Sequence, residues 1–230
     1  MSIPFGQSLA VGRPFICLVE DIVAVLLATT HEGWEMARQD SKFDPSALEV
    51  PFTECLRDGM RAALKSRGLK NIVVLPGTES RSKPSLRIPD GRTDIPIFVT
   101  DVFIEMEEHD PHAIIECKRL DGNDSDLVRE YVVSGINRFC SGQYSSNHRY
   151  GFMVGYLLAG TTKSVAVAAV NKFIAKHKSV AEELAMHQSQ PDVWKSKHLR
   201  EENDTIFLFH SFLKVKGTTK NEGSSTFQVG

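Results

Sequence analysis

The sequence predicts an α/β fold with a mixed central β-sheet flanked by helices. Apolar or alternating runs at residues 71–75, 92–100, 112–120 and 150–158 have the length of strands. Segments with apolar residues at three- to four-residue spacing lie before and between them, as in amphipathic helices. Consecutive strands favour antiparallel hairpins, whereas strand–helix–strand units favour parallel pairing, so both kinds of pairing are expected in one sheet.

Length and composition are those of an ordinary globular domain. The chain has 230 residues, of which 41% are hydrophobic and 24% charged, enough to bury a sizeable core. Its net charge of -2 provides no general basic surface, so a nucleic-acid contact would need a local basic patch. No secretory leader or bilayer-spanning apolar segment stands out, and the scattered cysteines lack zinc spacing. We therefore expect a reduced, cytoplasmic protein with no membrane partner.

The first part of the chain predicts a helical extension, placed at residues 15–40, ahead of the core. Its helix covers residues 15–39, with Gly33 as a candidate bend. A second helix at residues 52–67 has Pro51 at its start and Gly68 at its end, the usual arrangement. We expect one domain over residues 1–216, with its core at about 51–178, and a flexible tail at 217–230.

The middle of the chain predicts three strands. The first, at residues 71–75, ends at a Pro-Gly pair and is followed by a basic loop at 78–91. Pro96 in the second strand suggests a sheet edge or a bulge. An acidic turn at 107–110 precedes the third strand.

The last part alternates helices and strands. A helix capped by Asp124 or Ser125 runs to about residue 141. The nearly continuous apolar run at residues 150–158 indicates a central strand that is buried on both faces. The remaining expected elements are a helix at 162–178, a loop at 187–203 and a final strand or strand pair at 204–215.

The strand at residues 112–120 carries the main functional candidates. Strand side chains alternate between faces, so Glu116 and Lys118 share one face. A carboxylate and an ammonium on a largely buried strand are costly unless they have partners or a metal. If this strand pairs antiparallel with residues 92–100 about residue 106, Asp94 lies opposite Lys118. The alternative is a surface ion pair of little energetic weight.

Asp94, Glu116 and Lys118 together suit metal-dependent hydrolysis of phosphodiesters. Two carboxylates a few ångströms apart can hold Mg²⁺ or Mn²⁺, with water and phosphate oxygens completing the shell. Such a metal activates a bound water, and a lysine can orient that water or neutralise developing charge.

The run at 91–95 (Gly-Arg-Thr-Asp-Ile), followed by Glu116-x-Lys118, resembles the PD-(D/E)xK or restriction-endonuclease-like superfamily. The element order resembles that family's αβββαβ core. The resemblance implies that Asp94 and Glu116 are metal ligands, that Lys118 is the catalytic lysine and that Glu54 is an additional acidic residue. Thr93 departs from the proline of the family's motif without removing a ligand.

Several further residues are candidates for contacting nucleic acid. Gln143 resembles a polar position that some members of the family place near the site, and its alternative interpretation is a plain helix-end residue. Arg92 can contact a phosphate or pair with an acid. The other basic candidates either form a solvated face or supply phosphate contacts, and they are Arg57, Arg61, Lys65, Arg81, Lys83, Arg87 and Arg119.

The leading hypothesis is a divalent-metal-dependent deoxyribonuclease, with endonuclease favoured over exonuclease. The resemblance also implies work beside an ATPase or other subunit, as in anti-phage defence or DNA processing, or action as a homodimer. The alternative is a non-catalytic scaffold of the same fold that binds nucleic acid or a partner protein. A third hypothesis is an unrelated α/β protein in which Glu116 and Lys118 form a surface pair.

Overall fold

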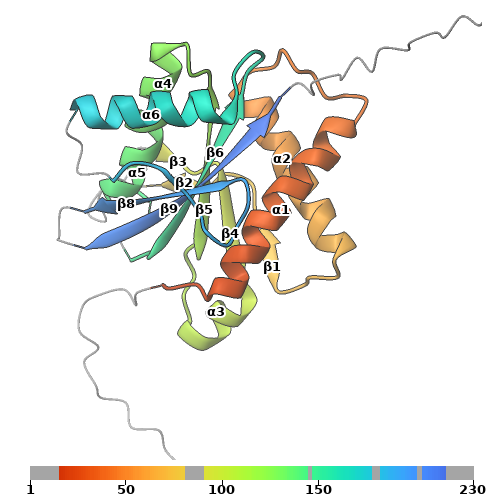
Figure 1. The fold of residues 1–230 in the computed structure, drawn as a ribbon. Coiled ribbons are helices and arrows are strands. Elements are labelled where there is room, and N and C mark those ends of the chain that lie inside the picture. Colours follow the sequence, from red (N-terminus) through yellow and green to blue (C-terminus); the bar gives the residue numbers. More distant parts are fainter. Residues whose placement is uncertain (1–15, 81–90, 145–146, 178–181, 201–203, 216–230) are drawn as a thin grey trace, which may run out of the picture.

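A seven-stranded mixed sheet organises the protein in the computed structural model, which describes residues 16–80, 91–144, 147–177, 182–200 and 204–215 (Figure 1). The three central strands are parallel to one another, and the other neighbours pair antiparallel. This confirms the expected mixed sheet. In spatial order the strands are β1 (Ile72–Val74), β4 (Ile95–Val99), β5 (Ala113–Leu120), β6 (Tyr150–Leu157), β9 (Thr205–Lys214), β8 (Val193–Leu199) and β7 (Ala185–Met186).

Helices cover both faces of this sheet (Figure 1). One face carries α1 (Glu20–Gln39) and α2 (Glu49–Ser66). The other carries α4 (Ser125–Tyr131), the π-helix η1 (Val132–Ile136), α5 (Asn137–Cys140) and α6 (Lys163–His177). Along β5, Ile115 and Cys117 enter the first core, whereas Ile114 and Leu120 enter the second. The apolar run of β6 likewise serves both cores, which confirms the predicted central strand. Among the described residues, no helix is long and apolar enough to cross a bilayer.

Helices α1 and α2 cross at two glycines. A Cβ on Gly33 would lie 2.5 Å from the backbone nitrogen of Met60, and one on Gly59 would collide with the carbonyl of Gly33. Both glycines are therefore required by close packing of two backbones. Gly33 was expected as a bend, but α1 is assigned as one continuous helix.

Between β4 and β5 the structure differs from the expected hairpin. Residues Thr100–Met106 form the short helix α3 in place of a strand extension and turn. Ile95 pairs with Ile115, so the predicted register was wrong by two residues, and the ladder places Asp94 toward Glu116 rather than Lys118. A two-residue shift preserves the face of every side chain, so Asp94, Glu116 and Lys118 still share one face.

Pro96 lies inside the sheet, between β1 and β5, and not on an edge strand. Its carbonyl accepts a hydrogen bond of 3.0 Å from Leu75, just beyond the end of β1. The N–H that proline lacks would face the same place, where the β1 ladder has already ended. The proline therefore costs the sheet little.

The helix expected from Asp124 to residue 141 is present in three segments. Asp124 is the N-cap, as predicted, and its carboxylate accepts from the backbone of Asp126 and Leu127. The π-helix η1 interrupts the α-helical winding in the middle.

The loop expected at residues 187–203 was wrong at its centre, where Val193–Leu199 form β8. Lys195 and Lys197 gave this strand a polar appearance. The predicted basic loop at 78–91 lies mostly outside the described residues, but its ends form the small β2 (Glu79–Ser80) and β3 (Gly91–Arg92) pair. The expected tail at 217–230 also lies outside them.

Candidate active site

The candidate site lies where β5 continues beyond the end of β4. Cys117 and Arg119 point their backbone N–H groups toward the missing neighbour strand. Asp94 Oδ2 accepts from Cys117 N at 2.7 Å, and Glu49 Oε2 accepts from Arg119 N at 3.1 Å. Two carboxylates thus replace a strand at this open edge, which fixes both acids relative to β5.

Thr93 helps to hold Asp94 in place. Its N–H donates to the Thr78 carbonyl at 2.8 Å, and its hydroxyl lies 3.0 Å from that of Thr78. A proline at this position could not make the backbone bond. The threonine at this position therefore has a local structural role.

Glu116 is fully buried and surrounded by donors. Its Oε1 lies 2.8 Å from Lys118 Nζ and 2.9 Å from Arg138 Nη1. Its Oε2 lies 2.6 Å from the hydroxyl of Tyr144. Every carboxylate oxygen of this buried acid therefore has a partner, as burial of a charge requires.

The pKa of Glu116 is raised to about 7, first by burial and then by the negative charge of Asp94. Lys118 and Arg138 oppose this shift. Two acids that repel each other in a buried setting are the arrangement that a bound cation relieves.

Lys118 is buried to a similar degree and joins the acids to one another. Its Nζ lies 3.0 Å from Glu49 Oε1 and 3.0 Å from the Cys117 carbonyl. Burial alone would lower the pKa of Lys118, but Glu116, Asp94 and Glu49 outweigh it and raise the pKa. The amine is therefore a fixed positive charge between the carboxylates.

Arg138 and Tyr144 complete the cluster, and the sequence analysis did not single out either. The hydroxyl of Tyr144 accepts from Arg138 Nη1 at 2.7 Å and lies 3.0 Å from the Arg92 carbonyl. Burial, followed by Glu116, raises the pKa of Tyr144, so the phenol stays neutral.

The π-helix η1 positions these residues. A π turn inserts an extra residue and so rotates all that follows it on the helix. Gly135 within it lies against β5 and β6, since a Cβ there would be 2.7 Å from the Met153 methyl group and 3.5 Å from Cγ of Lys118. An α-helical projection of the sequence does not predict the resulting direction of Arg138.

The structure places the other predicted residues as follows. Glu54 pairs with Arg57 on its own helix and makes no described contact with Asp94, Glu116 or Lys118. The acid of this helix that contacts Lys118 is Glu49, which lies before Glu54 on α2. The helix begins three residues before its predicted start, which is why Glu49 was missed.

Only some of the residues predicted to contact nucleic acid lie within the ranges that the structure describes. Arg92 is exposed, and its side chain donates to the Gly77 carbonyl at 3.2 Å. Arg119 follows Lys118 on β5, and Gln143 lies in the turn before Tyr144. Arg81 and Lys83 lie outside the described residues.

The donor set fits a hard divalent cation in its chemistry. The described residues contain no group of three or more His, Cys, Asp and Glu side chains that could hold a metal. Mg²⁺, however, keeps several waters and commonly uses one or two carboxylates. Asp94 and Glu116 supply these, and the Cys117 carbonyl faces the same edge.

Comparison of this chain with protein-family models, curated proteins and solved structures gives no match.

Proposed function

We propose that this protein is a divalent-metal-dependent nuclease that hydrolyses DNA, with endonucleolytic cleavage favoured. The observation that carries the proposal is the cluster of Asp94, Glu116 and Lys118 on one face at an open strand end. There the negative charge of Asp94 disfavours the ionised form of the buried Glu116, which lies beside a permanently charged lysine. Mg²⁺ or Mn²⁺ is the expected cofactor.

The fold supports the same proposal. Helix α2, strands β1, β4 and β5, the α4–α5 segment and β6 follow the αβββαβ order of the restriction-endonuclease-like core. The pairing is antiparallel, antiparallel and then parallel across β1, β4, β5 and β6. We infer this core from element order and pairing together.

Each side chain has a distinct role in the proposed reaction. A bound metal would polarise a water and the scissile phosphate. Asp94 and Glu116 would hold it, with Asp94 kept in position by Cys117 N–H. Lys118, fixed by Glu49, would orient the attacking water and neutralise charge on the phosphate. Tyr144 would keep Glu116 aligned.

A second candidate function is favoured by a specific observation. Lys118 and Arg138 already neutralise Glu116 through contacts of 2.8 and 2.9 Å, so the cluster is satisfied by protein groups alone. Such a site could be structural, in a scaffold that binds nucleic acid or a partner protein.

Cleavage of supercoiled and linear DNA with Mg²⁺ or Mn²⁺ tests the nuclease. We expect wild-type activity that EDTA removes and that Lys118→Ala lowers by a factor of about 10² to 10⁴. Lys163→Ala is a matched control, because this lysine pairs with Asp192 on another part of the fold. Activity that survives Lys118→Ala would remove the lysine from the mechanism.

Metal-linked stabilisation separates the two candidates when no cleavage is seen. A nuclease that waits for a partner should still melt at a higher temperature with Mn²⁺, whereas the scaffold should not. The proposal includes action beside an ATPase or other subunit, or as a homodimer. Repeating the cleavage assay with such a partner tests the first, and measuring the protein's mass in solution tests the second.

A further inference from the structure

Glu116 shares one carboxylate oxygen between two cations. Its Oε1 lies 2.8 Å from Lys118 Nζ and 2.9 Å from Arg138 Nη1, while its Oε2 lies 2.6 Å from the hydroxyl of Tyr144. A divalent ion held by Glu116 would therefore lie close to two positive charges at once. Like charges repel strongly in a buried site, so uptake of such an ion favours the departure of one of the two cations.

Lys118 is the more firmly held of the two cations. Its amine lies 3.0 Å from Glu49 Oε1 and 3.0 Å from the Cys117 carbonyl, in addition to its contact with Glu116. Only 9% of its side chain is exposed. Moving this amine would leave buried polar groups without partners, which is costly.

Arg138 is held less firmly and reaches the solvent. Within the described ranges, its guanidinium makes hydrogen bonds through Nη1, to Glu116 and to the hydroxyl of Tyr144 at 2.7 Å. Its side chain is 30% exposed, against 9% for Lys118. A guanidinium is a planar fork of several N–H donors, so others remain available for a further acceptor. This side chain can turn outward without leaving a charge stranded in the interior.

Tyr144 is fixed independently of that guanidinium. Its hydroxyl also lies 3.0 Å from the Arg92 carbonyl, and its ring packs edge to face on Phe139. The guanidinium carbon of Arg138 lies 5.7 Å from the centroid of the Tyr144 ring, within the range of cation–π attraction. The ring thus supports the arginine while leaving it free to change its acceptor.

The charges of the cluster also favour departure of the arginine. When ionised, Asp94, Glu116 and Glu49 carry three negative charges, whereas Lys118 and Arg138 carry two positive ones. Addition of a divalent ion would leave a surplus of one positive charge. If the arginine turns away, the ion and the lysine balance the three carboxylates, and the guanidinium can pair with a phosphate, which its fork matches.

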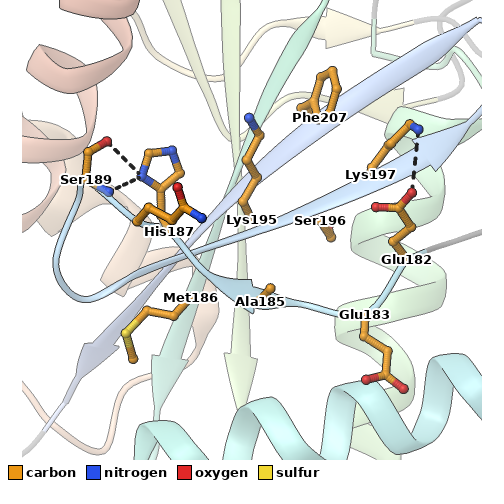
Figure 2. Close-up of a pocket in the computed structure, with 11 residues that line it drawn as sticks. Glu182, Glu183, Ala185, Met186, His187, Ser189, Lys195, Ser196, Lys197 and Phe207 are labelled. Carbon is orange, nitrogen blue, oxygen red and sulfur yellow. Dashed lines mark hydrogen bonds and ion pairs between the residues drawn. The ribbon is translucent and has the colours of Figure 1, made fainter.

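A hollow beside the edge strand β7 offers no such spare charge (Figure 2). It measures about 450 Å³, and two lysines, Lys195 and Lys197, and two acids, Glu182 and Glu183, border it. Lys197 pairs with Glu182 at 3.6 Å. The acids there match the lysines in number, so this hollow is not complementary to phosphate.

We propose that Arg138 is a displaceable counter-ion, which holds Glu116 until that carboxylate takes up a divalent ion and then turns outward to bind a phosphate of the nucleic acid. The inference rests on the proposed nuclease and adds a coupling between its two ligands. The metal makes the arginine available to the phosphate, and by linkage the phosphate, in holding the arginine, makes Glu116 available to the metal.

Chemical modification of arginine detects this movement without any cleavage. The protein is treated with phenylglyoxal in EDTA or in Mn²⁺, and peptide mass spectrometry gives the rate of modification at each arginine. We expect Mn²⁺ to raise the rate at Arg138 about three- to tenfold, because the guanidinium loses its carboxylate contact. Duplex DNA added with Mn²⁺ should lower the rate again. Arg129, exposed on α4, is the internal control and should react equally in EDTA and in Mn²⁺.

The Mn²⁺ affinity of variants measures the competition directly. In titration calorimetry without DNA, Arg138→Gln should bind Mn²⁺ about tenfold more tightly than the wild type, since Glu116 has no cation to release. Arg138→Lys, which keeps the charge, should stay closer to the wild type, and Arg129→Gln should match it. In the cleavage assay, Arg138→Gln should need less Mn²⁺ for its half-maximal rate, yet its maximal rate should fall because the phosphate loses a partner.

The outcomes that would overturn the inference differ from failure of the nuclease itself. If Mn²⁺ leaves the modification of Arg138 unchanged, or if Arg138→Gln binds Mn²⁺ no more tightly than the wild type, the arginine is a fixed partner of Glu116 and the nuclease proposal still stands. If neither the wild type nor any variant binds Mn²⁺, the nuclease proposal fails together with this inference. Circular dichroism checks that each variant is folded, and the modification experiment needs only the wild type.

Discussion

Glu116 is an acid whose burial favours the neutral form, yet two cations lie within 3 Å of it. Its charge is therefore set by its neighbours. Glu49 belongs to the same balance, because it holds Lys118 by one oxygen and the β5 backbone by the other.

Glu49→Gln and Glu54→Gln form a matched pair on one helix. If the cluster cuts DNA, Glu49→Gln should lower the cleavage rate about tenfold or more, since Lys118 loses a charged partner. Glu54→Gln should stay near wild type, because among the described residues Glu54 pairs with Arg57 and not with the cluster. The measurement is initial rate at saturating Mg²⁺. The opposite ranking would restore the sequence-based choice of Glu54.

At the residue scale, the sequence predicted which side chains share a face of the sheet, because this depends only on the alternation of side chains along a strand. Glu116 and Lys118 share a face in any straight strand, and Asp94 joins them in any register of the right parity. Glu49 depended on where a helix begins, and sequence patterns locate the ends of helices less well than the helices themselves. Arg138 and Tyr144 depended on a π turn and the loop after it, which leave no periodic signal.

At the scale of elements, the α1–α2 crossing is a tightly constrained contact. Each glycine lies against the other helix's backbone, which cannot rotate away as a side chain can.

Gly59→Ala should therefore destabilise the fold by about 3 kcal/mol, the upper end of overpacking costs, despite the better helix propensity of alanine. Urea unfolding followed by circular dichroism measures this. Lys65→Ala, exposed on the same helix, is the control and should change stability by less than about 0.5 kcal/mol. A neutral Gly59→Ala would mean that the helices can separate at low cost.

Elements with a clear apolar period were predicted, whereas two with mixed signals were not. β8 alternates lysines with buried Ser196 and His198, so its inward face looked polar. Segment 100–106 was expected to extend a strand, but its residues form a largely exposed helix, in which Val102 and Met106 pack against the first core.

At the scale of the whole molecule, a series of buried hydrogen bonds runs through the second core. The hydroxyl of Tyr131 lies 2.8 Å from His210 Nδ1, and Ser196 Oγ lies 2.7 Å from His210 Nε2 and 2.6 Å from His198 Nε2. It ties α4 to β9 and β8.

These buried hydrogen bonds predict that the folded protein loses stability as the pH falls. Burial lowers the pKa of His198 to about 4, and burial followed by His198 lowers the pKa of His210 well below 6.5. The unfolded chain protonates both histidines near pH 6.5. The stability that the fold gains by keeping them neutral is therefore fully present above that pH. It is lost as pH falls toward 4, by about 1.4 kcal/mol per pH unit for each histidine.

Urea unfolding at pH 7 and pH 5 checks this. Glu116 acts in the opposite direction, because its raised pKa costs stability as pH rises from 4.5 to 7. Variants are therefore compared with one another. His198→Gln should lose less stability on acidification than the wild type, whereas exposed His109→Gln should follow the wild type. Parallel pH curves for wild type and His198→Gln would exclude His198 as a source.

The open end of β5 has a consequence for how inactive variants are made. Asp94 and Glu49 occupy the donors that another chain's strand would otherwise seek, so these acids also guard against intermolecular β-pairing. Replacing Asp94 by alanine would leave Cys117 N–H unmatched and invite aggregation, whereas Asp94→Asn keeps an acceptor there. Insolubility of the alanine variant would thus indicate that the sheet had lost its protection against intermolecular β-pairing.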